Sequence, residues 1–183
     1  MHPTTRLAAL AVLAAACFPI PGPARAETYQ TCTGFIDSLP ATISTQGTWC
    51  LRKDVSTGMT SGAAITIAAN NVTIDCNHFK LGGLAAGSAT TATGIQASST
   101  RQNVAIRQCN IRGFRFGVML DGGAGHLIED NAFDGNTTFG MYVAGGVGIE
   151  CTDNLATARG NVVSGFATGI GLCLSSSNTV NTN

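Results

Sequence analysis

A short pattern of apolar residues, asparagine and glycine recurs along this chain and constrains its fold more than any other feature. Four segments carry two apolar residues five places apart, with asparagine three places after the first in three of the four. A glycine followed by alternating apolar residues comes after each segment. The segments are Ile74–Phe79, Ile106–Ile111, Ile128–Phe133 and Ala158–Val163, and the glycines are Gly94, Gly117, Gly140 and Gly169. Such a short unit must stack on its neighbours to bury a face.

The spacing of these segments indicates a unit of 22 residues. Their first residues lie 32, 22 and 30 positions apart, which places two insertions at 82–93 and 144–157. Few residues are charged and 23 are glycine, a composition that favours strands and turns over helices. The frame of leucine-rich repeats is absent, and a β-sandwich requires no fixed register. The sequence therefore predicts an all-β parallel solenoid of about five coils.

The two-residue period of a strand predicts which side chains face the interior. The interior set is Ile74, Ile106, Ile128, Ile95, Val118, Leu120, Met141, Val143, Ile170 and Leu172. In the glycine-led strands the residues predicted to face outward are Gln96, Met119, Tyr142 and Gly171. This outward row contains no acid and no arginine, so neither a lyase nor a hydrolase site can be assembled from it.

The pattern resembles the coil repeat of right-handed parallel β-helices in the pectin/pectate lyase-like superfamily. Residues Cys32–Gly83, with the run Ala64–Asp75, are similar to the N-terminal part of bacterial β-helix repeat proteins. The resemblance covers the whole mature chain and implies the fold. It implies little about activity, because this fold carries lyases, hydrolases, epimerases and non-enzymes.

The first 26 residues have the features of a secretory signal. Arg6 precedes an apolar stretch, Leu7–Ile20, and Ala24-Arg25-Ala26 provides a small-x-small cleavage site. We therefore expect a secreted or periplasmic protein cleaved after Ala26, and no later run is long enough to span a membrane. A lipoprotein site at Cys17 is the less favoured alternative. The expected organisation is a signal peptide at 1–26, an N-terminal cap at 27–61 and coils at 62–183.

The mature chain contains six cysteines, an even number that favours disulfides in an exported protein. We predict a Cys32–Cys50 disulfide that fastens the cap and a Cys151–Cys173 disulfide that ties an insertion to the next coil. Cys76 and Cys109 fall at nearly the same place on successive coils, so they either stack or bond. No spacing typical of a zinc site is present.

Two polar rows have structural interpretations. Asn77, Asn131 and Asn161 are predicted to occupy turns in a left-handed conformation and to stack their amides, with Cys109 taking the same place in the second copy. The residues after the first apolar position alternate in sign, which predicts a row of surface ion pairs rather than a ligand site. These residues are Asp75, Arg107, Glu129 and Arg159.

The loops offer the chemistry that the strands lack. We expect Asp121, His126, Glu150 and Asp153 to converge as an acid/base set or a metal site, and the resemblance implies calcium as the metal. A solvated polar loop is the alternative interpretation. Met119 and Tyr142 are candidates for a carbohydrate-binding surface. His78 is a further candidate that sequence alone does not separate from a turn residue.

Two classes of function remain. The first is a secreted β-helix that binds an anionic polysaccharide and cleaves or epimerises it; as an enzyme it would be a lyase, a glycoside hydrolase or an epimerase. The second is a non-catalytic surface or adhesive solenoid. The formal charge of zero and the small number of lysines leave no basic surface for nucleic acid.

The end of the chain carries one more expectation. One repeat after Ala158 places the next apolar position at Val180 and the next asparagine position at Asn183. A solenoid that stops on an open coil exposes unpaired backbone and core. This interpretation predicts a truncated chain, or self-association through its last coil.

Overall fold

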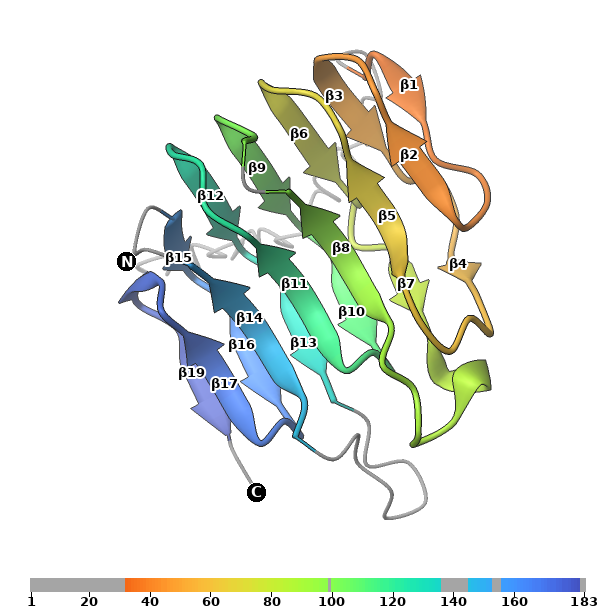
Figure 1. Ribbon diagram of the computed structural model, residues 1–183, viewed down its shortest axis with the longest axis vertical. Coiled ribbons are helices and arrows are strands. Elements are labelled where there is room, and N and C mark those ends of the chain that lie inside the picture. The colour runs from red at the N-terminus through yellow and green to blue at the C-terminus, as the bar shows by residue number, and fades with distance from the viewer. Residues whose placement is uncertain (1–31, 99, 136–144, 153–155, 182–183) are drawn as a thin grey trace, which may run out of the picture.

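The computed structural model describes residues 32–98, 100–135, 145–152 and 156–181, which form β-strands in three sheets. Each turn of the chain adds one strand to each sheet, and all pairs are parallel (Figure 1). The coils stack from β1 at one end of the molecule to β17 and β19 at the other. The predicted all-β parallel solenoid is confirmed. The signal peptide expected at 1–26 lies outside the described residues.

In each turn of the solenoid the chain passes through sheet A, then sheet C, then sheet B. Sheet A contains β1 (Gly34–Phe35), β3 (Gly47–Cys50), β6 (Val72–Asp75), β9 (Val104–Arg107), β12 (His126–Glu129), β15 (Ala156–Arg159) and β18 (Leu174–Ser176). Sheet C contains β4 (Val55–Ser56), β7 (Lys80–Gly82), β10 (Asn110–Arg112), β13 (Ala132–Asp134), β16 (Val162–Ser164) and β19 (Thr179–Asn181). Sheet B contains β2 (Ala41–Ile43), β5 (Ala63–Ile67), β8 (Thr93–Ala97), β11 (Phe116–Leu120), β14 (Val147–Cys151) and β17 (Thr168–Gly171). A 3-10 turn, η2 (Leu84–Ala86), lies between β7 and β8.

The core is a set of columns in which each buried side chain lies over its counterpart in the next coil. Sheet A contributes Ile74, Ile106 and Ile128, which are in register and fully buried. Sheets B and C contribute further columns, including Ile65, Ile95, Val118 and Ile149 from B and Leu81, Ile111, Phe133 and Val163 from C. Alternate residues on each strand therefore face a continuous apolar interior, as the two-residue period predicts.

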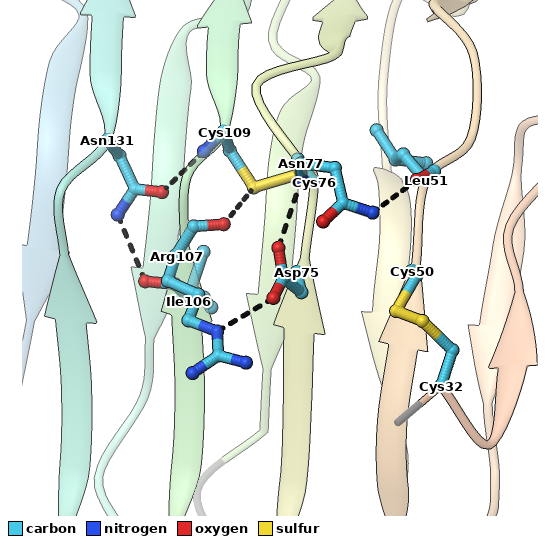
Figure 2. A network of polar contacts seen from close by, with 10 residues as sticks. All are labelled: Cys32, Cys50, Leu51, Asp75, Cys76, Asn77, Ile106, Arg107, Cys109 and Asn131. Atoms are coloured by element: carbon cyan, nitrogen blue, oxygen red, sulfur yellow. Dashed lines mark hydrogen bonds and ion pairs between the residues drawn. A yellow bond between two sulfur atoms is a disulfide. The ribbon is translucent and has the colours of Figure 1, made fainter. Parts of the chain in front are cut away.

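Three asparagines, Asn131, Asn161 and Asn178, form a ladder at the corner between sheets A and C. The side-chain oxygen of Asn161 accepts hydrogen bonds from the backbone N–H (3.1 Å) and the side-chain amide (3.0 Å) of Asn131. Asn178 accepts the same two bonds from Asn161, both at 2.9 Å. The ladder starts at Cys109, whose backbone N–H donates to Asn131 (2.9 Å), as Figure 2 shows. The predicted stacking of amides is confirmed for Asn131 and Asn161.

The left-handed residue at this corner is the one before the ladder position. Gln108, Asp130 and Ser177 have φ of 53°, 54° and 53°, and Gly160 has φ of 65°. The prediction that the ladder asparagines themselves are left-handed is therefore wrong for Asn131 and Asn161. The preceding residue makes the turn, so that the asparagine points inward. Asn77, with φ of 46°, is left-handed but donates to the Leu51 carbonyl instead of joining the ladder.

The predicted row of alternating charges on sheet A forms ion pairs. Arg107 lies 2.9 Å from Asp75, and Arg159 lies 2.6 Å from Glu129 (Figure 2 shows the first pair). Both pairs join residues that are in register on adjacent strands. The ion pairs are thus a consequence of the parallel register.

Three disulfides link parts of the solenoid among the described residues. Cys32–Cys50 and Cys151–Cys173 form as predicted. Of the two alternatives for Cys76 and Cys109, the structure shows bonding, with their Cα atoms 4.7 Å apart. Since Cys109 is the first rung of the ladder, this disulfide continues the coil-to-coil link where asparagine is absent.

One glycine-led strand is shifted from its predicted place. The repeat spacing favours Gly140–Val143, but β14 is Val147–Cys151, with Ile149 beside Val118 and Cys151 beside Leu120. The pattern Gly-apolar-x-apolar occurs again at Gly148–Cys151, and this later copy is the one that pairs with β11. The additional residues therefore lie before β14 and not at 144–157. Met141 and Val143, expected in the interior, lie outside the described residues.

The last coil is shorter than the repeat predicts. Ser175, not Val180, lies beside Ala158, and Val180 lies beside Val163 in sheet C. Between residues that are in register, the chain takes ten residues from sheet B to sheet A in an earlier coil (Val118 to Ile128) but only five in the last coil (Ile170 to Ser175). The ladder position therefore falls at Asn178 and not at Asn183. In this shortened turn Leu172 has φ of 53° and is 60% exposed, whereas it was expected inside.

Candidate functional site

The outer face of sheet B carries an acidic residue that the predicted register misses. Gln96, Met119, Glu150 and Gly171 are in register on consecutive strands, so their side chains share the outer row. The prediction that this row holds no acid is therefore wrong, because Glu150 follows Met119 in the place expected for Tyr142. Tyr142 itself lies outside the described residues.

Asp121 follows β11 directly and points to the same face. Its Oδ2 accepts a hydrogen bond from Gln96 Nε2 at 3.2 Å, and Gln96 Nε2 also lies 3.8 Å from Met119 Sδ. The backbone N–H of Asp121 donates to the Ala97 carbonyl at 3.1 Å, which extends the strand pairing by one residue. Gln96 therefore fixes the position of the Asp121 carboxylate over sheet B.

Glu150 and Asp121 interact electrostatically. Partial burial raises the pKa of Glu150 above its ordinary value, and the negative charge of Asp121 raises that pKa further. The Glu150 carboxylate lies over Gly171 in the next coil, where a methyl group would overlap its Oε2. The result is a carboxylic acid that keeps its proton to a higher pH than usual, next to a second carboxylate.

The other residues expected at this site lie elsewhere or are not described. His126 is buried; its Nδ1 accepts a hydrogen bond from the Val104 N–H (3.2 Å), and its Nε2 lies 3.0 Å from the Gly122 carbonyl. One ring nitrogen therefore serves the backbone of β9 in the previous coil, and the other serves the turn that follows Asp121. Asp153 lies outside the described residues. Among the expected residues, the structure brings Asp121, Glu150 and Met119 together.

Sheet C carries a groove that sequence reasoning did not identify. A hollow of about 450 Å³ crosses the outer face of β7, β10, β13 and β16, and a smaller one of about 260 Å³ lies beside it. Both are lined by Lys80 and Arg112. The sequence signal for this groove is the alternation of inward and outward side chains on these strands. Alternation predicts which side chains face outward, but it does not predict that the small residues between them leave a hollow.

Two ion pairs line the larger hollow. Lys80 Nζ lies 3.3 Å from Asp54 Oδ2, and Arg112 lies 3.3 Å from Asp134. The backbone N–H of Lys80 also donates to Asp54 Oδ1 at 2.9 Å, and this hydrogen bond lowers the pKa of Asp54 below its ordinary value. His78, the second histidine noted in the sequence, lies on the wall of this hollow.

The described part of the chain shows no group of three or more histidine, cysteine, aspartate or glutamate side chains that could hold a metal ion. It also contains no helix long and apolar enough to cross a membrane. The calcium that the resemblance implies therefore stays a prediction.

Comparison with known proteins identifies the family. A family model described as a right-handed β-helix region matches residues 57–183, which is more than half of the chain. Comparison with curated proteins gives no match, and neither does comparison with solved structures. The match agrees with the parallel strands in all three sheets, while the place within the pectin/pectate lyase-like superfamily stays a prediction. The chain belongs to the right-handed β-helix family.

Proposed function

We propose that this protein binds an extracellular polysaccharide along the outer face of sheet B and hydrolyses it with Asp121 and Glu150. The observation that carries the proposal is the raised pKa of Glu150 beside Asp121 on an exposed strand face. Glycoside hydrolases use a protonated carboxyl group and an ionised one on either side of the bond that breaks.

The positions of the two residues suit these roles. Asp121 lies one strand across and about two residues along from Glu150, so their Cα atoms are about 8 Å apart by the usual strand dimensions. Both side chains face outward from sheet B, so their carboxyl groups can reach the separation of roughly 5 to 10 Å that catalytic carboxyl pairs have. Glu150 is the candidate general acid because its pKa is raised. Asp121, held by Gln96, is the candidate base or nucleophile.

Two further features support an extracellular glycan as the ligand. Residues 1–26 have the pattern of a secretory signal, and the three disulfides are of a kind that persists outside the cytosol. Met119, which is in register with Glu150 and two residues before Asp121, provides an apolar contact surface beside both carboxylates. An anionic polysaccharide at this face requires a cation to offset its repulsion from Asp121, and calcium is a cation that carboxylate oxygens bind.

The test is a panel of neutral and uronic-acid polysaccharides with and without calcium, in which reducing ends and direct binding are both measured. We expect hydrolysis by the parent protein, and at least a hundredfold loss in Glu150→Gln and in Asp121→Asn, since general acid catalysis contributes about 10²-fold to 10⁴-fold. Asp130→Asn is the matched control, because Asp130 is exposed, lies at the corner between sheets A and C, and has a left-handed backbone that asparagine tolerates.

A non-catalytic solenoid is the second candidate. It is favoured by the ion pairs of sheet A, which show that charged rows on this molecule serve neighbouring coils. Binding without release of reducing ends or unsaturated products in every condition would support this candidate over hydrolysis. Unsaturated products would indicate elimination instead.

A further inference from the structure

The two hollows on sheet C form a site whose charge is distributed unevenly. Lys80 and Arg112 are shared by both hollows, but their partner carboxylates, Asp54 and Asp134, line the larger one alone. The described lining of the smaller hollow contains Lys80, Arg112 and the hydroxyl-bearing Ser56, and no acid. A ligand across both would meet two cations at one side, and acids together with polar side chains at the other.

Gly82 lines the smaller hollow together with Lys80 and Ser56. Gly82 is in register with Arg112 on one side and with Ser56 on the other. A methyl group at position 82 would lie 2.9 Å from Ser56 Oγ and 3.6 Å from Lys80 Cε. The space next to Gly82 is therefore bounded by the hydroxyl of Ser56 and the Lys80 side chain, and Arg112 adds a cation from the neighbouring strand.

The larger hollow has a lining that suits hydroxyl groups. It runs across four strands, from β7 to β16, a length of about 14 Å at the usual strand spacing. Asp54 and Asp134 provide acceptors, and Ser164 provides a hydroxyl. The exposed, small Ala132 lies between Asn110 and Val162 in the row and keeps the middle of the groove open.

We propose that sheet C holds a second binding site, for a short acidic oligosaccharide whose carboxylate lies between Lys80 and Arg112 and whose hydroxyl groups lie along the groove towards Ser164. A carboxylate forms charge-assisted hydrogen bonds with ammonium and guanidinium groups. A neutral sugar would not form charge-assisted hydrogen bonds with Lys80 and Arg112. A simple anion without hydroxyl groups would not form hydrogen bonds with Asp54, Asp134 and Ser164 in the larger hollow. The site is independent of Asp121 and Glu150, which lie on a different sheet.

The test is titration calorimetry of the full chain with a short oligomer of uronic acid and with its carboxyl-reduced, neutral counterpart. We expect the acidic oligomer to bind and the neutral one to bind at least about tenfold more weakly, since the neutral oligomer makes no charge-assisted hydrogen bonds with Lys80 and Arg112. Arg112→Gln and Lys80→Gln should each weaken binding of the acidic oligomer by about tenfold and leave the neutral one unchanged. Arg112→Lys should retain part of the affinity because it keeps the charge.

Arg107→Gln is the matched control. Arg107 belongs to the same coil, is ion-paired like Arg112, and has a side chain 40% exposed against 35% for Arg112, but it lies on sheet A. It should not affect binding. All titrations use the full chain with Glu150→Gln and Asp121→Asn in place, which removes cleavage at sheet B and leaves the lining of sheet C unchanged, so a failure of the hydrolysis proposal does not affect the result. Gly82→Ala, which narrows the smaller hollow without removing a charge, should weaken binding of the acidic oligomer.

Three outcomes would overturn the proposal. The first is equal affinity for the acidic and neutral oligomers, and the second is an equal loss in Arg107→Gln and Arg112→Gln. The third is equal binding of an acidic peptide of the same charge, which would show that the groove does not recognise the sugar. Thermal unfolding of each variant identifies any loss that comes from misfolding, and Arg112→Lys then provides the deciding comparison.

Discussion

At the scale of single residues, the asparagine ladder shows how a buried polar side chain stabilises this fold. Asn161 is fully buried, yet its amide donates to the Ile128 carbonyl and to Asn178, and its oxygen accepts two bonds from Asn131. A buried amide is favourable only when its hydrogen bonds are made. The ladder meets that condition because each coil from Cys109 to Asn178 provides hydrogen-bond partners for the next.

We expect Asn161→Ala to lower the free energy of unfolding by about 2–4 kcal/mol, because it leaves buried partners above and below without their hydrogen bonds. Urea denaturation followed by circular dichroism measures this loss. Asn181→Ala, at an exposed asparagine of β19, is the control and should change stability by less than about 0.5 kcal/mol. Equal effects of the two substitutions would contradict the role given to the ladder.

The raised pKa of Glu150 predicts how the stability of the protein changes with pH. This pKa is raised above the ordinary value of 4.5, so the folded state favours the protonated form of the side chain. The stability that this form contributes is fully present below pH 4.5 and is lost as the pH rises through the raised pKa. Glutamine does not ionise, so its contribution to stability does not change with pH. We therefore expect the stability of Glu150→Gln relative to the parent protein to increase as the pH rises from 4.5 through the raised pKa of Glu150.

Urea denaturation at a series of pH values measures the difference between the two proteins. In an Asp121→Asn background the same difference should shrink but keep its sign, because burial, the larger cause of the raised pKa, remains. A difference that does not change with pH would contradict the raised pKa. The experiment needs no substrate, so it tests the electrostatics of the site separately from its function.

At the scale of strands, the recurring glycine of sheet B has a steric cause. A methyl group on Gly94 would lie 2.5 Å from the carbonyl oxygen of Gly117, and one on Gly117 would lie 2.5 Å from that of Gly148. For Gly148 the corresponding atom is the Gly169 carbonyl oxygen, at 2.7 Å. Successive glycines therefore let the backbones of adjacent coils approach where sheet B begins.

We expect Gly148→Ala to destabilise the protein by about 1–3 kcal/mol, the usual cost of overpacking, because a backbone carbonyl in a stacked coil cannot move aside. Gly58→Ala is the matched control, since a methyl group there would make only ordinary contact with Ala85, at 3.6 Å. Thermal unfolding of both variants tests this. A neutral Gly148→Ala would show that the repeating glycine is not required for packing.

The same strands show how far sequence reasoning extends. The repeat predicts the sheets, the interior columns and the ion pairs, because a two-residue period and a parallel register fix these features together. The place of β14 was not predicted, because two Gly-apolar-x-apolar segments lie eight residues apart and only tertiary pairing selects one. Because the later segment pairs, Glu150 lies in the outer row of sheet B at the place predicted for Tyr142, and the row contains an acid.

The groove on sheet C was missed for a different reason. Alternation predicts that Arg112 and Asp134 face outward, which is correct, but a hollow depends on what is absent between side chains. The small Ala132 lines the groove, and the turn that carries Asp54 reaches the groove from the previous coil. Features formed by several coils at once have no signature in a single repeat.

At the scale of the whole molecule, the solenoid is held by contacts between neighbouring coils, and its disulfides lie at separate places along the stack. Cys32–Cys50 joins the first residues described to β3, Cys76–Cys109 joins two central coils, and Cys151–Cys173 joins the end of β14 to the turn after β17. In a stack with nearest-neighbour contacts, the loss of one link affects its own coils first.

The last coil is the part of the described stack with the most exposed apolar surface. Leu172, Leu174 and Val180 are each more than 40% exposed, and β18 and β19 consist of exposed residues. Few buried apolar contacts and exposed backbone pairing make a segment prone to local opening. The Cys151–Cys173 disulfide is therefore the covalent link that holds this coil against β14.

We expect the paired substitution Cys151→Ala and Cys173→Ala to cost about 3 kcal/mol by the loop-entropy relation for a closed loop of this size. The loss should appear as faster amide hydrogen exchange in β17, β18 and β19, with β5, β8 and β11 unchanged. Removing Cys32 and Cys50 in the same way is the matched control and should leave exchange in the last coil unchanged, because it acts on the opposite end of the stack. Uniform acceleration along the chain in the first variant would mean that the molecule opens as one cooperative unit, and that coil-to-coil contacts are strong enough to pass the loss of one disulfide through the whole solenoid.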